Sequence, residues 1–104
     1  MIDREIGDRR GEGDALGSLG IAYSDLGEAH KAVEFYGRAL AIDREIGDRR
    51  GEGIALSNLG EKYFDLDVKE KAVEFMKQAL EIFEVIESPN AEDARTKLRE
   101  WGAL

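Results

Sequence analysis

The chain contains no cysteine, only one histidine and only one proline. Without cysteine it can form neither a disulfide framework nor a thiolate metal site, and a lone histidine cannot complete a tetrahedral zinc site. No phosphate-binding loop and no nucleophile with a neighbouring base can be recognised, so we expect no catalysis and no cofactor. A cysteine-free composition suits a reducing compartment, which predicts a cytoplasmic location.

Positive charge and long apolar runs are also scarce. Lys and Arg number 15 against 23 Asp and Glu, which gives a net charge of −8. Nucleic-acid binding depends on neutralising phosphates, and anionic membranes likewise attract basic residues, so neither is an expected partner. The apolar runs are only a few residues long, far short of the roughly 20 needed to cross a bilayer. Residues 1–5 lack the apolar segment of a signal peptide.

What the chain does contain is an internal repeat of 40 residues. The stretch IDREIGDRRGEG occupies residues 2–13 and occurs again at residues 42–53. Shifting the chain by 40 residues aligns residues 2–41 with 42–81, and 26 of these 40 positions are identical. The two copies are therefore expected to share one structure. The near-verbatim stretch indicates either a recent duplication or an engineered scaffold.

Each copy contains two segments in which apolar residues recur every three or four positions. In the second copy, one such stripe runs through Ala55, Leu56, Leu59, Tyr63 and Leu66, and another runs from Ala72 to Ile86. This spacing predicts two amphipathic helices per copy. The predicted first helices cover residues 8–26 and 48–66, and the predicted second helices cover residues 29–46 and 69–87, with ends defined to about 2–4 residues.

These elements predict an all-α protein, an antiparallel helix-hairpin solenoid that forms a single domain over residues 1–104. Its expected parts are the tail of a truncated preceding helix (1–7), two repeats (8–46 and 48–87) and a capping helix (89–102). The truncated tail is inferred because the same letters follow Ala41 in the second copy. Ser88 and Pro89 favour the start of the capping helix, with a loose polar tail as the alternative.

The start of each predicted first helix carries glycines and arginine pairs. The glycines, expected to weaken these first turns, are Gly11, Gly13, Gly51 and Gly53. The arginine pairs are Arg9-Arg10 and Arg49-Arg50. Neighbouring acidic residues offset both pairs, so we interpret them as solvated helix starts rather than as an anion site.

The pattern of small and large residues resembles the tetratricopeptide repeat, whose signature places Leu-Gly and Tyr on the first helix and Ala on the second. The second copy reads Leu56-x₂-Leu59-Gly60-x₂-Tyr63, then Ala72-x₃-Met76 and Ala79-Leu80; the first reads Leu16-x₂-Leu19-Gly20-x₂-Tyr23, then Ala32-x₃-Tyr36 and Ala39-Leu40. The period of 40 residues is longer than the family's usual period of about 34. In this respect the chain resembles a long-repeat branch of the family. The resemblance implies a right-handed superhelix that binds proteins or peptides.

The resemblance also implies a concave groove lined by the first helix of each repeat. By register with Leu59-Gly60, its positions fall on Ile54, Ser57, Asn58, Glu61, Phe64 and Asp65, and in the first copy on Asp14, Gly17, Ser18, Ile21, Ser24 and Asp25. Asn58 is the sharpest candidate because its amide both donates and accepts hydrogen bonds; a solvated surface amide is the alternative. The basic clamp of some family members is not reproduced, since Asp14, Gly17 and Ile54 stand at its positions.

The chemistry of these positions suggests the kind of partner. Ile21, Ile54 and Phe64 would be exposed apolar groups on the groove face, although Phe64 could instead pack on a neighbouring helix. The acidic members are Asp14, Asp25, Glu61 and Asp65, which favours a basic or basic-apolar protein or peptide.

Self-assembly is the alternative function. Two repeats are fewer than the three or so that a stable array usually needs. The outer side of the first helix lacks a neighbouring hairpin, so Leu16, Leu19 and Tyr23 would have an uncovered flank. A second copy of the chain could cover it, which predicts a homodimer or a higher form.

Overall fold

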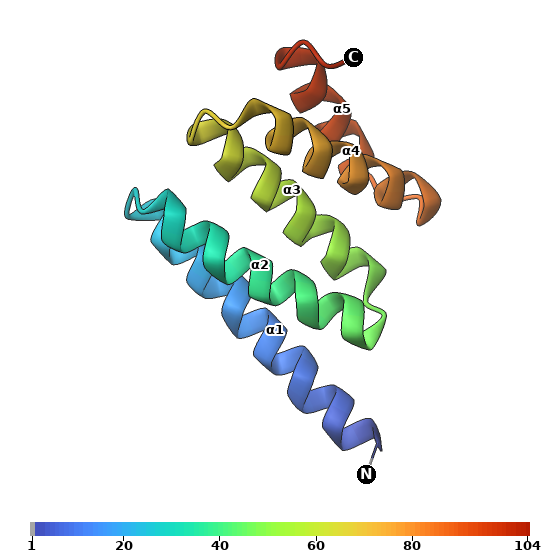
Figure 1. The fold of residues 1–104 in the computed structure, drawn as a ribbon. Helices are drawn as coiled ribbons and strands as arrows, with labels where there is room; N and C mark the ends of the chain where they lie inside the picture. Colours follow the sequence, from blue (N-terminus) through green and yellow to red (C-terminus); the bar gives the residue numbers. More distant parts are fainter. Residues whose placement is uncertain (1) are drawn as a thin grey trace.

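The structure, a computed structural model, describes residues 2–104, with side chains described from residue 7 onward. This part of the chain holds no strand and five helices: α1 (Ile2–Asp25), α2 (Ala29–Ile46), α3 (Arg49–Asp65), α4 (Lys69–Val85) and α5 (Asn90–Glu100). Each helix packs on the next along the chain, so α1–α2 and α3–α4 form two stacked hairpins and α5 packs on α4 (Figure 1). The predicted all-α helix-hairpin solenoid is confirmed.

The apolar stripes predicted from the spacing are the buried faces of the helices. One core cluster extends from α2 to α5, and its largest fully buried side chains are Leu56, Met76, Phe83 and Leu98. A smaller cluster between α1 and α2 consists of Leu16, Ala39 and Ile42, with Phe35 packed against it. Because α5 contributes a fully buried leucine to the main cluster, the last helix is part of the core rather than a loose polar tail.

The predicted helix boundary at residue 7 is absent from the structure. α1 runs through this position without a break, although the identical sequence at residues 42–53 forms the end of one helix, a turn and the start of the next helix. There, Gly47 adopts the left-handed conformation with φ 72°, and the Asp48 carboxylate accepts a hydrogen bond from the Gly51 N–H at 2.9 Å. One sequence of 12 residues therefore has two backbone structures in the same chain.

Packing explains the difference between the two copies. In the second copy the letters before the turn belong to α2, whose Ile42 is buried in the cluster with Leu16 of α1. The described structure places no helix against the corresponding outer side of α1. Without that packing partner, helical hydrogen bonding continues through Gly7, since adding residues to an existing helix is easier than nucleating a new one.

Two glycines on the first helices allow close approach of the second helices. A Cβ atom at Gly20 would lie 2.6 Å from the Tyr36 ring, which agrees with the packing role of the Leu-Gly motif. A Cβ atom at Gly53 would lie 2.6 Å from the buried Phe83 ring. Gly53 is therefore not a weak point in a frayed first turn, as predicted, but a contact that α4 requires.

Candidate binding groove

Most of the predicted groove residues line two clefts that share Ile54, whereas Ser24, Asp25, Phe64 and Asp65 line neither. The first cleft, about 350 Å³, lies between α1 and α3. Its predicted lining residues are Asp14, Gly17, Ser18, Ile21, Ile54 and Asn58, and α2 adds Tyr36, Ala39 and Asp43. Asn58 is half-buried and lines this cleft.

The second cleft, about 590 Å³, lies between α3 and α5. From α3 it is lined by Ile54, Ser57 and Glu61, and from α5 by Asn90, Asp93, Thr96, Lys97 and Glu100. The Ser57 hydroxyl donates to the Ile54 carbonyl at 3.0 Å, and Lys97 lies 3.8 Å from the Glu61 carboxylate. The α5 wall was not predicted, because the register argument covered only the two repeats and α5 has no counterpart in them.

Asp43 of α2 is an acidic lining residue that the sequence did not predict. Burial, together with the negative charges of Asp48 and Asp14, raises the pKa of its carboxyl from 3.8 to about 6. Two glycines leave room for it: a Cβ at Gly51 would lie 2.9 Å from Asp43 Oδ1, and one at Gly13 3.6 Å from the same atom. Because these positions lack side chains, the half-buried carboxylate borders the cleft.

Phe64 is the predicted residue whose surroundings differ from the groove interpretation. Its ring stacks on Trp101, with centroids 4.6 Å apart and planes 8° from parallel. The side chain is half-buried, so the expected exposed apolar group is absent and the alternative, packing on a neighbouring segment, is what the structure shows. Trp101 follows α5 and lies outside the two repeats, so an alignment of the repeats could not predict this pairing.

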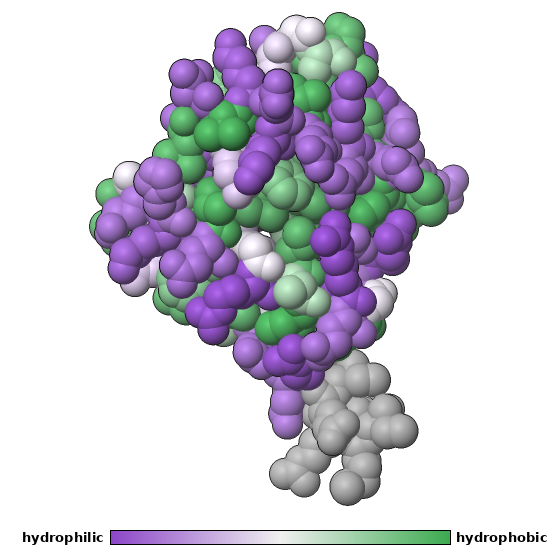
Figure 2. All heavy atoms as spheres, viewed as in Figure 1, coloured by the Kyte–Doolittle hydropathy of each residue, from purple (hydrophilic) through white to green (hydrophobic). Residues whose placement is uncertain are grey.

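The other predicted residues divide between exposed apolar groups and acids outside the clefts. Ile21 and Ile54 remain 52% and 37% exposed, large fractions for isoleucine side chains, and both line the first cleft. Asp65 pairs with Lys62 at 2.8 Å, and neither it nor Asp25 lines either cleft. On the face shown in Figure 2, hydrophilic side chains surround small, separate apolar patches.

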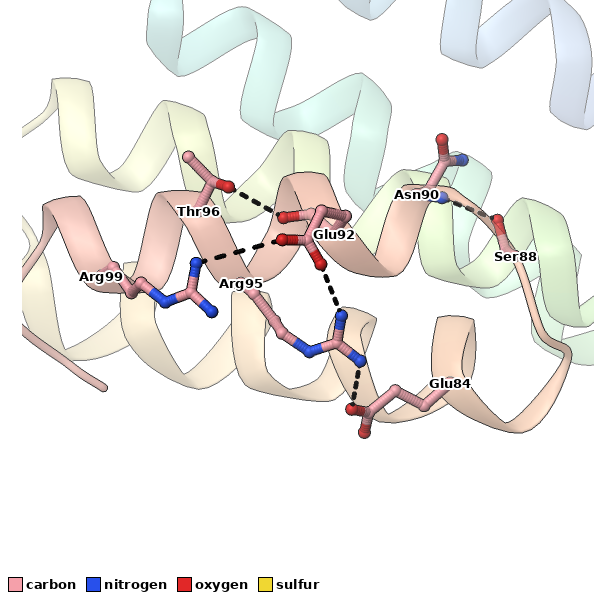
Figure 3. Close-up of polar contacts among 7 residues, drawn as sticks. All are labelled: Glu84, Ser88, Asn90, Glu92, Arg95, Thr96 and Arg99. Atoms are coloured by element: carbon pink, nitrogen blue, oxygen red, sulfur yellow. Dashed lines mark hydrogen bonds and ion pairs between the residues drawn. The ribbon is translucent and has the colours of Figure 1, made fainter.

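An ion pair joins the α5 wall of the second cleft to α4. Figure 3 shows Arg95 of α5 between two carboxylates, with 2.8 Å to Glu92 and 2.9 Å to Glu84. Hydrogen bonds to Glu84 and then to Glu92 raise the pKa of this guanidinium. At the start of α5 the Ser88 hydroxyl accepts from the Asn90 N–H at 3.1 Å. Exposed ion pairs of this kind contribute little energy, so the position of α5 depends mainly on its buried Ala91, Ala94 and Leu98.

Comparison with known protein families supports the interpretation of these hairpins. The sequence profile of the Tetratricopeptide repeat matches residues 11–84, which is more than half of the chain. The chain belongs to the tetratricopeptide-repeat family. The matched region extends from α1 to the end of α4 and leaves α5 outside the repeats. No curated protein matches the sequence.

Membership in the tetratricopeptide-repeat family gives the general function. Tetratricopeptide-repeat domains bind proteins or peptides, and they are typically interaction scaffolds rather than enzymes. None of the helices in residues 2–104 combines the length and the apolar character that crossing a bilayer requires. The residues with described side chains contain no cluster of three or more His, Cys, Asp or Glu suited to holding a metal ion.

Proposed function

We propose that the protein binds an extended peptide or a partner helix in a groove that crosses α1, α3 and α5. The observation that carries the proposal is the pair of clefts that share Ile54. Together they offer a path across three helices, with half-buried Asn58 beside it. Apolar contact at Ile21 and Ile54 and hydrogen bonding at Asn58 would together recognise side chains and backbone of a ligand.

The partner is proposed to be basic or basic-apolar. The first cleft presents the carboxylates of Asp14 and Asp43, and the second presents Glu61, Asp93 and Glu100 against a single Lys97. A cationic side chain bound in the first cleft would also offset the repulsion by Asp48 and Asp14, which together with burial raises the pKa of Asp43. The net charge of −8 would speed the approach of such a partner at low ionic strength. A cytoplasmic location stays a prediction from composition.

A double substitution in the shared part of the groove tests this function. The probe is a labelled dodecapeptide of alternating Lys and Leu, and the variant is Ile54→Ser/Asn58→Ala. We expect fluorescence anisotropy to show binding to the native protein and affinity about tenfold weaker for the variant, because an apolar contact and a backbone partner are lost together.

The control variant for that titration is Val85→Ser. Val85 is 69% exposed and lines neither cleft, so its replacement removes apolar surface elsewhere and should leave the affinity unchanged. Equal affinity of the native protein and the groove variant for the Lys/Leu peptide would contradict the groove assignment. Equal affinity for a Glu/Leu peptide would contradict the basic character of the partner.

Asp43 makes the proposed binding pH-dependent. Since its folded pKa is about 6, the carboxyl loses its charge between pH 7.5 and pH 5, and affinity for the Lys/Leu peptide should fall about threefold over this range. Asp43→Asn should remove most of this pH dependence, whereas Asp25→Asn, outside both clefts, should keep it. A pH profile that is the same for Asp43→Asn and the native protein would show that Asp43 does not contact the ligand.

Protonation of Asp43 also affects the stability of the fold, in the opposite direction to its effect on peptide binding. A folded-state pKa above the unfolded value means that the folded state binds the proton more readily, so this group's contribution favours folding as the pH falls from about 7 towards 4. Asp43→Asn should therefore be more stable than the native protein at pH 7.5, and most of the difference should be lost by pH 4, close to the unfolded pKa of 3.8. Thermal unfolding at the two pH values separates this effect from peptide binding.

Self-assembly into a homodimer or a higher form is the second candidate. It is favoured by the outer side of α1, where Leu19 and Leu26 are 43% and 71% exposed. Sedimentation equilibrium at high micromolar concentration should then give a mass above that of the monomer. A monomer mass with full helicity would rule this candidate out and leave the groove proposal intact.

A further inference from the structure

The two hairpins differ in how far the outer side of their first helix is covered. Leu19 of α1 is 43% exposed, but its counterpart Leu59 in α3 is 3% exposed. Leu19 belongs to a stripe on α1 spaced by three and four residues, which we call the α1 stripe: Glu12, Ala15, Leu19, Ala22 and Leu26. Every member of the α1 stripe is exposed, whereas Glu52, Ala55 and Leu59 of α3 are buried.

The structure shows which element covers this stripe in α3. Both first helices pack on their own second helix, but α3 packs on α2 as well. The α5 side of α3 is the opposite one, where Ser57 and Glu61 face the second cleft. Val33, Tyr36 and Leu40 of α2 share the core cluster with the buried part of the α3 stripe. The face of α2 that bears these residues is therefore the natural cover for a stripe of this sequence.

An ion pair marks the register of that contact. In α3 the Glu52 carboxylate forms ion pairs with two guanidinium groups. One belongs to Arg49 of its own helix, at 3.0 Å, and the other to Arg44 of α2, also at 3.0 Å. In α1 the corresponding Glu12 pairs with Arg9 of its own helix at 2.7 Å and is 49% exposed. Arg9 is the counterpart of Arg49 in the 40-residue repeat, so the local half of the arrangement is the same in both helices. The arginine that α2 supplies to Glu52 has no equivalent in the described structure.

A second folded copy of the chain has no free second helix to cover the α1 stripe, so the homodimer considered above would have to use another face of the copy. Its α2 is covered by α3 and its α4 by α5, so both of its second helices are already occupied. We propose that the α1 stripe docks a separate amphipathic helix of the α2 type, with an apolar ridge followed by an arginine one turn beyond it. This site lies apart from the two clefts, so the proposal goes beyond binding in the groove.

The probe for this site is the chain's own α2 sequence as a free peptide, residues 29–47 with blocked ends. Titrated into the intact protein, it should bind the native chain and the Val85→Glu control alike. Leu19→Glu and Leu26→Glu place a charge on the α1 stripe at positions that are already exposed, so both should fold, and each should weaken binding at least about tenfold. Circular dichroism checks that helix content is unchanged.

A charge exchange tests the register. Glu12→Arg in the protein, or Arg44→Glu in the peptide, should each weaken binding about fivefold, and the two together should restore it. Losses that add up instead of cancelling would overturn the proposed register. Leu19→Glu binding the peptide as tightly as the native protein would overturn the site itself.

Two further outcomes separate the possible occupants and the two proposals. If the peptide does not bind and the native protein forms a dimer that Leu19→Glu abolishes, the occupant is a second copy and the α2-type helix is wrong. Asn58→Ala should weaken the Lys/Leu peptide and leave the α2 peptide unchanged. If Asn58→Ala weakened binding of the α2 peptide, that peptide would lie in the groove and the proposal would be overturned. This outcome does not depend on whether the groove also binds the Lys/Leu peptide.

Discussion

Replacing Leu98 with alanine is expected to reduce the free energy of unfolding by about 3 kcal/mol, because the side chain is fully buried and its removal leaves a cavity. For a domain of this size, that loss lowers the unfolding midpoint by about 12–20 °C. The expectation follows from the position of α5, which inserts Ala91, Ala94 and Leu98 into the core that the two hairpins share. Thermal unfolding followed by circular dichroism measures it.

Leu104→Ala is the matched control, since it removes the same atoms from a leucine that is 64% exposed. Its midpoint should stay within about 2 °C of the native value, because truncating an exposed side chain leaves no cavity. Similar midpoints for the two variants would mean that α5 does not cap the core. The α5 wall of the second cleft would then have no fixed position, and the part of the groove that extends to Lys97 would lose its basis.

Gly53→Ala should destabilise the protein although alanine favours helices. A methyl group at Gly53 meets the Phe83 ring at 2.6 Å, and Phe83 is too deeply buried to move aside freely. Overpacking of this kind costs about 1–3 kcal/mol, which exceeds the gain of up to about 1 kcal/mol in helix propensity. We expect the unfolding midpoint to fall by about 5–10 °C.

Gly37→Ala provides the opposite expectation within the same protein. A Cβ at this position in α2 meets nothing within 4 Å, so only the propensity gain of about 0.5–1 kcal/mol remains and the midpoint should rise. If both substitutions raised the midpoint, α4 would not approach α3 as closely as the structure shows.

The repeat in the sequence was sufficient to predict most of the fold. Spacing placed the second helix at 29–46 and the third at 48–66, and the structure has them at Ala29–Ile46 and Arg49–Asp65. The start of α1 could not be predicted in the same way. The letters IDREIGDRRGEG permit both a continuous helix and a turn at the glycine, and only the presence of a packed neighbour decides between them.

The candidate site was predictable where it depends on register and not where it depends on contacts between different elements. Ile54 and Asn58 line a cleft because their place on the helix follows from the Leu-Gly motif. Phe64 could not be placed, since its partner Trp101 lies beyond the repeats. Asp43 was missed because it lies on the second helix, and its approach to the cleft depends on glycines from two other helices.

The most direct test of the central claim is to map the Lys/Leu peptide on the protein by ¹⁵N–¹H NMR. A ligand in the groove should shift the amide signals of Ser18, Ile54, Asn58 and Glu61, which come from both clefts, and leave those of the outer residues Glu34 and Val85 in place. Shifts centred on the outer residues, or on α1 alone, would contradict a groove that crosses α1, α3 and α5.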